Sequence, residues 1–277
     1  MMNLYYPFLE RTYYISIIVN EPVEIYLVNE LLATLPINFQ IIDNASDIRP
    51  YDDLVISTKK SLDNSFDFLK SKIIFLDLNN DFIFLMKIVM SLHKISTIKT
   101  CVIGVDPGRT IGIALCVNGI PIIGKIVKGT FEGINVIKNI MKNLYLISTH
   151  INCIINVGAG GQVYKSRILY SLQRNGLIDR VRIVQENKTT PHNHNFPSKI
   201  KHIYAASLIA QRNGRPISKS DFILNFRKTD LREIQNFSRI ISGNITISLK
   251  LARQVALDEI SIYEAIEQMK KKKNYML

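Results

Sequence analysis

Asp106 is the residue of this sequence whose type and position best suit chemistry. It follows the apolar run Val102–Val105 and precedes Pro107, Gly108 and Arg109. A carboxylate at the end of a strand can be held rigidly while it faces solvent, and an adjacent glycine lets a bulky ligand approach the backbone. Arg109 is then placed to contact a phosphate through two N–H groups. Asp-Pro-Gly is also a common turn, so a purely structural interpretation stays open.

A second candidate feature is the glycine-rich segment 158–161, which precedes a predicted helix carrying Lys165 and Arg167. Such a turn presents backbone N–H groups to an anion, so we expect the two cations to contact a phosphate backbone. A tight strand-to-helix turn accounts for the glycines equally well. Nucleotide hydrolysis is excluded, because Tyr164 stands where a phosphate-binding loop requires glycine before its lysine.

The charge of the chain is strongly asymmetric. The 277 residues contain 35 Lys and Arg against 23 Asp and Glu, a net charge of +12. Residues 1–95 have a net charge of −4 and residues 96–277 a net charge of +16. This excess predicts a polyanionic partner, DNA or structured RNA, although a generally basic surface is the alternative. The further candidate contacts are Lys188, Lys199 and Lys201.

Composition also excludes several classes of protein. Three cysteines are too few and too scattered for a disulfide framework or a zinc cluster, and their apolar surroundings indicate core residues in a reducing cytoplasm. Glu10 and Arg11 interrupt the first apolar stretch, so no signal peptide is expected. No uncharged apolar run reaches the roughly 18 residues that span a bilayer, so we expect no membrane partner.

The elements that must position these residues fall into three regions. Residues 1–95 predict a small α/β domain of unknown role, 96–217 a second α/β domain, and 218–277 a helical extension with a lysine tail. The predicted order within the second region is three strands, then helix, strand, helix, strand and helix. Asn118-Gly119 joins the second and third strands as a hairpin. We therefore expect a mixed five-stranded sheet with helices on both faces.

This order of elements, with an aspartate on the first strand, resembles the ribonuclease H-like superfamily, and most closely its RuvC and YqgF groups. These include Holliday-junction resolvases and a pre-ribosomal RNA nuclease. The segment 104–114 is similar to their first-strand motif, Gly-Ile-Asp-x-Gly followed by Gly-x-Ala. Segment 184–190 resembles the YqgF motif Asp-Glu-Arg-Leu-Thr-Thr, and segment 201–206 resembles the last-helix motif Asp-x-x-Ala-Ala.

The resemblance implies a metal site for Mg²⁺ or Mn²⁺ at Asp106, Glu186 and His202, and it implies catalysis by the same three residues. His202 stands where YqgF proteins have an acid, and an imidazole suits Mn²⁺ better than Mg²⁺. Some RuvC proteins instead read His-x-x-Asp-Ala, which would make His202 their histidine and would put Ala205 in the place of their aspartate. Glycines follow Val157, where RuvC proteins have a glutamate. If the two remaining carboxylates lie close together, their repulsion should raise the pKa of one of them.

His192 and His194 form a His-x-His pair in the loop between Glu186 and the helix of His202. We expect this loop to lie over the site, where the pair could bind a metal or supply a proton. Exposed histidines with no role are the alternative.

The leading hypothesis is thus a metal-dependent nuclease acting on structured DNA or RNA. The alternative is a catalytically degenerate nucleic-acid-binding protein of the same fold. A kinase of the actin-like relatives is disfavoured, because the chain lacks a second Asp-x-Gly motif. By analogy with resolvases, which act on two-fold junctions, a homodimer is also expected.

Overall fold

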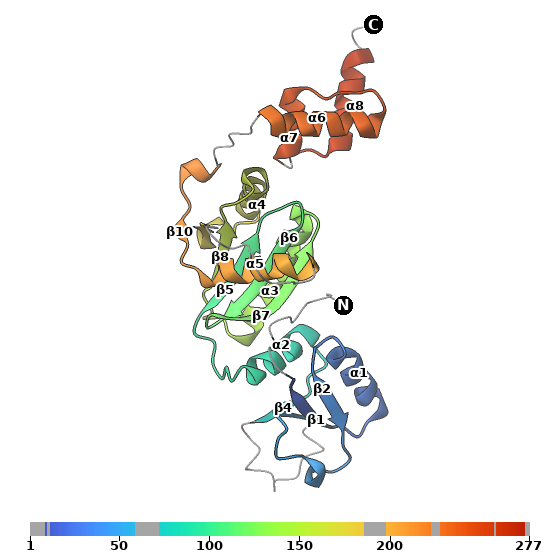
Figure 1. The fold of residues 1–277 in the computed structure, drawn as a ribbon, viewed down its shortest axis with the longest axis vertical. Coiled ribbons are helices and arrows are strands. Elements are labelled where there is room, and N and C mark those ends of the chain that lie inside the picture. The colour runs from blue at the N-terminus through green and yellow to red at the C-terminus, as the bar shows by residue number, and fades with distance from the viewer. Residues whose placement is uncertain are drawn as a thin grey trace.

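The structure is a computed structural model, and it describes residues 9, 12–58, 72–185, 198–222, 228–257 and 259–274. Figure 1 shows three successive regions along the long axis of the molecule: a sheet near the N-terminus, a larger central sheet and a group of helices at the C-terminus. The chain is α/β in its first two regions and helical in the third.

The first sheet has four parallel strands in the order β2-β1-β3-β4. Its strands are β1 (Tyr14–Ile18), β2 (Asn38–Ile41), β3 (Leu54–Ser57) and β4 (Ile73–Phe75). Helix α1 (Pro22–Leu32) connects the first two strands, with proline at its first turn, where the missing N–H costs no hydrogen bond. A short helix, η1 (Ala45–Asp47), precedes β3. Helix α2 (Asp81–Leu92) follows β4, and the Asn80 side chain accepts a hydrogen bond from the Ile83 N–H at its start.

The central sheet is mixed and has six strands in the order β10-β9-β8-β5-β6-β7. Strands β5 (Cys101–Asp106), β6 (Ile111–Val117) and β7 (Ile120–Val127) form an antiparallel meander, whereas β8 (Cys153–Gly158) and β9 (Val181–Val184) run parallel to β5. The prediction of a mixed sheet is confirmed, but the expected number of five strands is wrong. Residues Arg215–Pro216 form a sixth strand, β10, antiparallel to β9. Two residues, one of them proline, carry no alternating pattern that a sequence could reveal.

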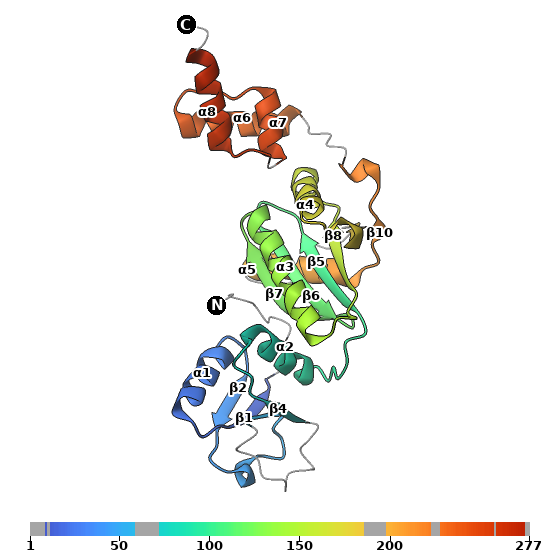
Figure 2. The same ribbon diagram turned by 180° about the vertical axis from the view of Figure 1, so that it is seen from behind.

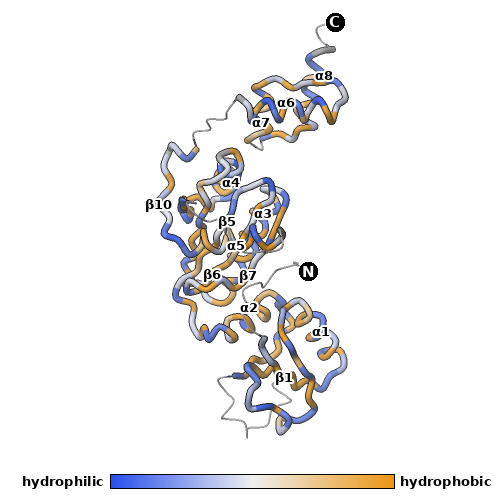
Figure 3. Tube along the Cα trace, in the orientation of Figure 1, coloured by the Kyte–Doolittle hydropathy of each residue, from blue (hydrophilic) through white to orange (hydrophobic). Residues whose placement is uncertain are grey.

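Helices cover both faces of the central sheet (Figures 1 and 2). Helix α5 (Ser198–Gln211) lies on one face, and α3 (Thr130–Ile147) and α4 (Gln162–Arg174) lie on the other. The short helices η3 (Ile178–Arg180) and η4 (Lys219–Phe222) flank β9 and β10 in sequence. In Figure 3 the apolar residues follow the central strands, which are buried between these layers.

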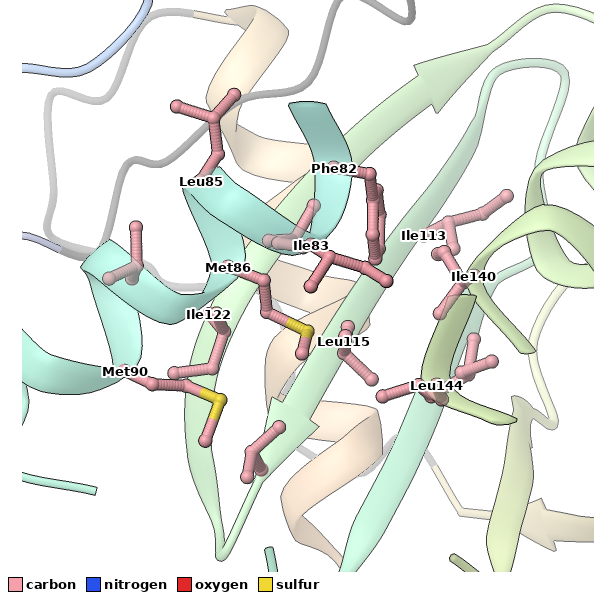
Figure 4. Close-up of a cluster of buried hydrophobic side chains, with 14 of the residues drawn as sticks. Phe82, Ile83, Leu85, Met86, Met90, Ile113, Leu115, Ile122, Ile140 and Leu144 are labelled. Carbon is pink, nitrogen blue, oxygen red and sulfur yellow. The ribbon is translucent and has the colours of Figure 1, made fainter. Parts of the chain in front are cut away.

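Helix α2 joins the two sheets into one hydrophobic core. It contacts β3 and α1 on one side and β7 and α3 on the other. Figure 4 shows Phe82, Ile83 and Met86 of α2 against Leu115 and Ile122 of the central sheet. The Asn80 Nδ2 also donates a hydrogen bond to Asn143 Oδ1 of α3, at 2.7 Å. The predicted domain boundary at residue 95 falls just after this helix. Helix α2 therefore belongs to the predicted N-terminal domain, although it covers β7 of the central sheet.

The C-terminal helices have a core of their own. They are α6 (Lys228–Ser242), α7 (Leu249–Ala256) and α8 (Ile262–Asn274). Ile247, Ala252 and Ala265 are among the residues buried between them. Ser261 and Glu264 form a capping box at the start of α8, because each side chain accepts a hydrogen bond from the other residue's backbone N–H. We call these three helices the C-terminal bundle.

Small residues let α5 approach the central sheet closely. Gly104, Ala114 and Gly124 are cross-strand neighbours on β5, β6 and β7 and face α5. An alanine Cβ at Gly104 would overlap the carbonyl oxygen of Ala206 in α5, and one at Gly124 would overlap Ile203. The helix can therefore pack here only because no side chain separates its backbone from the strands.

We expect Gly104→Ala to lower the free energy of unfolding by about 3 kcal/mol or more, since neither backbone can yield without displacing α5. Gly133→Ala is the matched control. Its Cβ would meet Val127 at an ordinary 3.5 Å inside helix α3, and alanine favours helix by about 0.5–1 kcal/mol. In thermal melts the melting temperature of Gly104→Ala should lie below that of the wild type, and that of Gly133→Ala above it. Equal melting temperatures would contradict this account of the α5 contact.

Candidate functional site

Asp106 is the last residue of β5, a central strand of the six-stranded sheet. It pairs with Gly112 of β6 and points toward the α5 face, as Gly104 does two residues earlier. Its side chain is 19% exposed. The carboxylate is thus fixed by a sheet strand but still reaches the surface at the edge of the sheet.

His202 of α5 lies against this carboxylate. Its Nδ1 is 3.2 Å from Asp106 Oδ2, and its side chain is 41% exposed. Gly112 permits this approach, because a Cβ there would overlap the His202 carbonyl group. When Asp106 is ionised it can only accept, so the Nδ1–H of His202 donates, and in a neutral imidazole the lone pair is then on Nε2.

Burial raises the pKa of Asp106 above its ordinary value, and the hydrogen bond and charge of His202 offset part of this rise. The sequence led us to expect a raised pKa from repulsion by Glu186. Glu186 lies outside the described residues, so this expectation stays a prediction; among the described residues the physical cause is the loss of water around the carboxylate. The ionised form of Asp106 therefore lowers the free energy of unfolding.

Several predicted site residues lie outside the described residues: Glu186, Lys188, His192 and His194. For Lys199 only the backbone, in the first turn of α5, is described. Strand β9 ends at Val184, and it runs parallel to β8, which runs parallel to β5. The carboxyl end of β9 is therefore at the same edge of the sheet as Asp106.

Within the described part of the chain, no group of three or more His, Cys, Asp and Glu side chains could hold a metal ion. The neighbouring strand explains part of this. Val105 pairs with Val157, so Gly158 occupies the level of Asp106 on β8 and supplies no carboxylate. One carboxylate and one imidazole are a partial donor set that fits Mn²⁺ better than Mg²⁺, since Mg²⁺ prefers oxygen ligands throughout.

Asn156 is a residue of this site region that the sequence analysis missed. It faces α5 from β8, paired with Gly104, and is 3% exposed. Its Nδ2 donates to the carbonyl oxygens of Ile209 at 3.1 Å and Arg212 at 2.8 Å, at the C-terminal end of α5. These bonds hold the C-terminal end of α5, the helix whose close packing on the sheet depends on the glycines. The sequence signal that could have identified Asn156 is that it is the single polar side chain in the otherwise apolar run Cys153–Val157.

The four predicted phosphate contacts whose side chains are described differ in their surroundings. Arg109 and Lys201 are exposed. Lys165 is 12% exposed and lies 3.7 Å from Asp221 of η4, which also accepts two hydrogen bonds from Arg215. These bonds to Arg215, together with those from Ser218, hold the pKa of Asp221 well below its ordinary value. Lys165 is therefore engaged within the protein.

Arg167 is engaged in a different way. Its Nε donates to the carbonyl oxygen of Ala256 at 2.5 Å, and its Nη2 donates to that of Val255 at 2.9 Å. Both acceptors belong to the last turn of α7, where helix carbonyls lack partners and a cation is favourable. Arg167 thus fastens the C-terminal bundle to α4. The sequence could not reveal this, because the acceptors are backbone atoms almost 90 residues away.

Comparison with known proteins bears on the C-terminal bundle. A family model described as a three helical bundle domain matches residues 229–272, which cover almost all of α6, α7 and α8. No curated protein matches the chain. None of the described helices combines the length and the apolar character that a membrane crossing needs.

We expect Asp106→Asn to stabilise the metal-free protein at neutral pH by about 1 kcal/mol, because it removes a buried charge and keeps a polar partner for His202. A raised native pKa means that the folded wild type binds its proton at higher pH than the unfolded chain. The wild type should therefore recover stability as pH falls toward the ordinary value of aspartate, and the difference should vanish there. Chemical denaturation between pH 4 and 8 in a chelator measures this. A wild type more stable than the variant at pH 7 would contradict it.

Proposed function

We propose that this chain is a metal-dependent nuclease with a ribonuclease H-like fold of RuvC or YqgF type, acting on structured DNA or RNA. The observation that carries the proposal is the contact between Asp106 and His202 at the end of a central strand. These residues come from two of the three motifs on which the resemblance rests, 96 positions apart. The element series from β5 to α5 is the one expected from that resemblance.

The residues that would hold the ions are Asp106, His202 and Glu186. A bound divalent ion would activate a water molecule and stabilise the leaving oxygen of the phosphodiester. The role of the chain is to present the donors without reorganisation. Asp106 is fixed by the ladder to Gly112, and His202 is oriented by its Nδ1 contact, which leaves Nε2 as an acceptor for a proton or a metal.

The net charge of +16 on residues 96–277 supports a nucleic acid as the substrate. A polyanion would gain affinity from counterions released when its phosphates meet these cations, so binding should weaken steeply with salt. The exposed side chains of Arg109 and Lys201 lie close in sequence to Asp106 and His202. In this proposal they position a phosphate backbone near the carboxylate.

A second candidate function is binding without cleavage. Gly158 stands beside Asp106 where a third acid is expected, and the described residues form no group of three ligands. In this alternative Asp106 is retained as part of the fold and the basic surface alone serves the function.

Metal binding separates the two functions. We expect Mn²⁺ to raise the melting temperature by several degrees and Mg²⁺ to raise it less, because a ligand that binds only the native state stabilises it. Asp106→Asn should abolish the rise, together with any Mn²⁺-dependent cleavage of branched DNA or structured RNA, while binding survives. Differential scanning fluorimetry and gel cleavage assays give both measurements.

Two further variants sharpen the test. Asp179→Asn changes an exposed carboxylate in η3 and should behave as the wild type. His202→Asp replaces the imidazole by an oxygen donor and should shift the preference from Mn²⁺ toward Mg²⁺. A wild type with neither a metal-dependent shift nor cleavage would favour the binding-only function.

A further inference from the structure

A cavity of about 410 Å³ lies between the central sheet and the C-terminal bundle. One wall comes from the turn after β5, the end of β7, the start of α3, and α4. The other wall comes from α6, the end of α7 and the start of α8. Gly108 and Arg109, which follow Asp106 closely in the turn after β5, line the cavity, whereas Asp106 itself faces α5 and does not.

The charged residues that line this cavity are all cationic. Arg109 and Lys128 line it and are both exposed. Arg167 lines it as well, and its guanidinium donates hydrogen bonds to backbone carbonyls at the end of α7. Among the described residues that line the cavity there is no aspartate or glutamate. Arg109 and Lys128 have no ion-pair partner among the described residues, so both are available to a ligand. The excess of Lys and Arg over residues 96–277 adds a favourable potential for an anion.

The remaining lining is apolar and partly aromatic. Tyr164 of α4 lies on one wall and Phe237 of α6 on the other. Phe237 is 55% exposed, and Ile240 of the same helix is exposed as well. The other apolar residues of α6, Leu231, Ile234 and Ile241, pack against the bundle core. An exposed phenylalanine beside two cations is the combination that binds unpaired nucleotides, since bases stack on aromatic rings while cations follow the phosphates.

The size of the cavity selects the form of nucleic acid. Pockets for small organic ligands range from about 300 to 1,000 Å³, so this cavity accepts a nucleotide unit but no duplex. Arg167 fixes the distance between the two walls by fastening α7 to α4. These bonds hold the end of α7, which forms part of the second wall, against α4.

We propose that this cavity binds an unpaired segment of a nucleic acid strand, with phosphates at Arg109 and Lys128 and a base against Phe237. This inference rests on the proposed function. It adds that the substrate of the proposed nuclease contains a single-stranded stretch, which leads from the cavity to Asp106. The C-terminal bundle then belongs to the substrate-binding part of the protein.

The test measures binding of the full chain to labelled single-stranded DNA, single-stranded RNA and a blunt DNA duplex by fluorescence anisotropy in a chelator. The double variant Arg109→Ala/Lys128→Ala should weaken single-strand binding at least tenfold and reduce the slope of log K against log salt by about 1.4, because two phosphate contacts are lost. Phe237→Ala should weaken it about tenfold and leave the slope unchanged.

The matched control removes two charges from later turns of α3, the helix whose start lines the cavity. Lys138→Ala/Lys142→Ala changes two exposed lysines and should leave single-strand affinity within twofold of the wild type. Melting temperatures establish that each variant is folded. Equal affinity of the cavity and control variants, or tighter wild-type binding to the blunt duplex than to both single strands, would overturn the proposal.

The metal experiment keeps this inference distinct from the proposed nuclease. Loss of single-strand binding in the cavity variants, with no Mn²⁺ effect on the wild type, would support the cavity and contradict the nuclease. Mn²⁺-dependent cleavage abolished by Asp106→Asn, with unchanged binding in the cavity variants, would support the nuclease and contradict the cavity.

Discussion

The backbone-to-backbone approach of α5 to the central sheet is the constraint on which the candidate site depends. The row formed by Gly104, Ala114 and Gly124 removes the side chains that would otherwise separate helix and strands. Gly112 extends the gap to the level of Asp106, so that His202 reaches the carboxylate. Asn156 then ties the far end of the same helix to β8. An ordinary helix-on-sheet distance would leave the two polar side chains apart.

Much of the central region was predictable from the sequence, because its strands are mostly apolar runs and helices α3 and α4 are amphipathic. The predicted order of strands and α-helices is the one that the structure shows from residue 101 to 211, whereas the short helix η3 was not predicted. Strand β10 was not predictable, since Arg215–Pro216 pairs through two residues only. The candidate site was accessible only in part: Asp106 is marked by its place after a strand, whereas His202 was recognised by motif resemblance.

The partners of the basic residues lay beyond prediction. Lys165 and Arg167 belong to a segment that indicates phosphate binding, yet one lies beside Asp221 and the other holds backbone carbonyls of α7. Conversely, Lys128 and Phe237 carry no motif and line one cavity although they are more than 100 residues apart. Charge and periodicity describe each segment alone, but such contacts depend on how distant segments meet.

The burial of α2 between the two sheets has a consequence for cooperativity. Because Phe82, Ile83 and Met86 pack on the central sheet while the same helix covers β3, the core is continuous across both sheets. The C-terminal bundle, by contrast, has a separate core. Local opening of the N-terminal sheet would therefore expose the apolar face of β7 and loosen the scaffold behind Asp106. Local unfolding of the bundle would break the Arg167 bonds to α7 but leave the core of the two sheets covered.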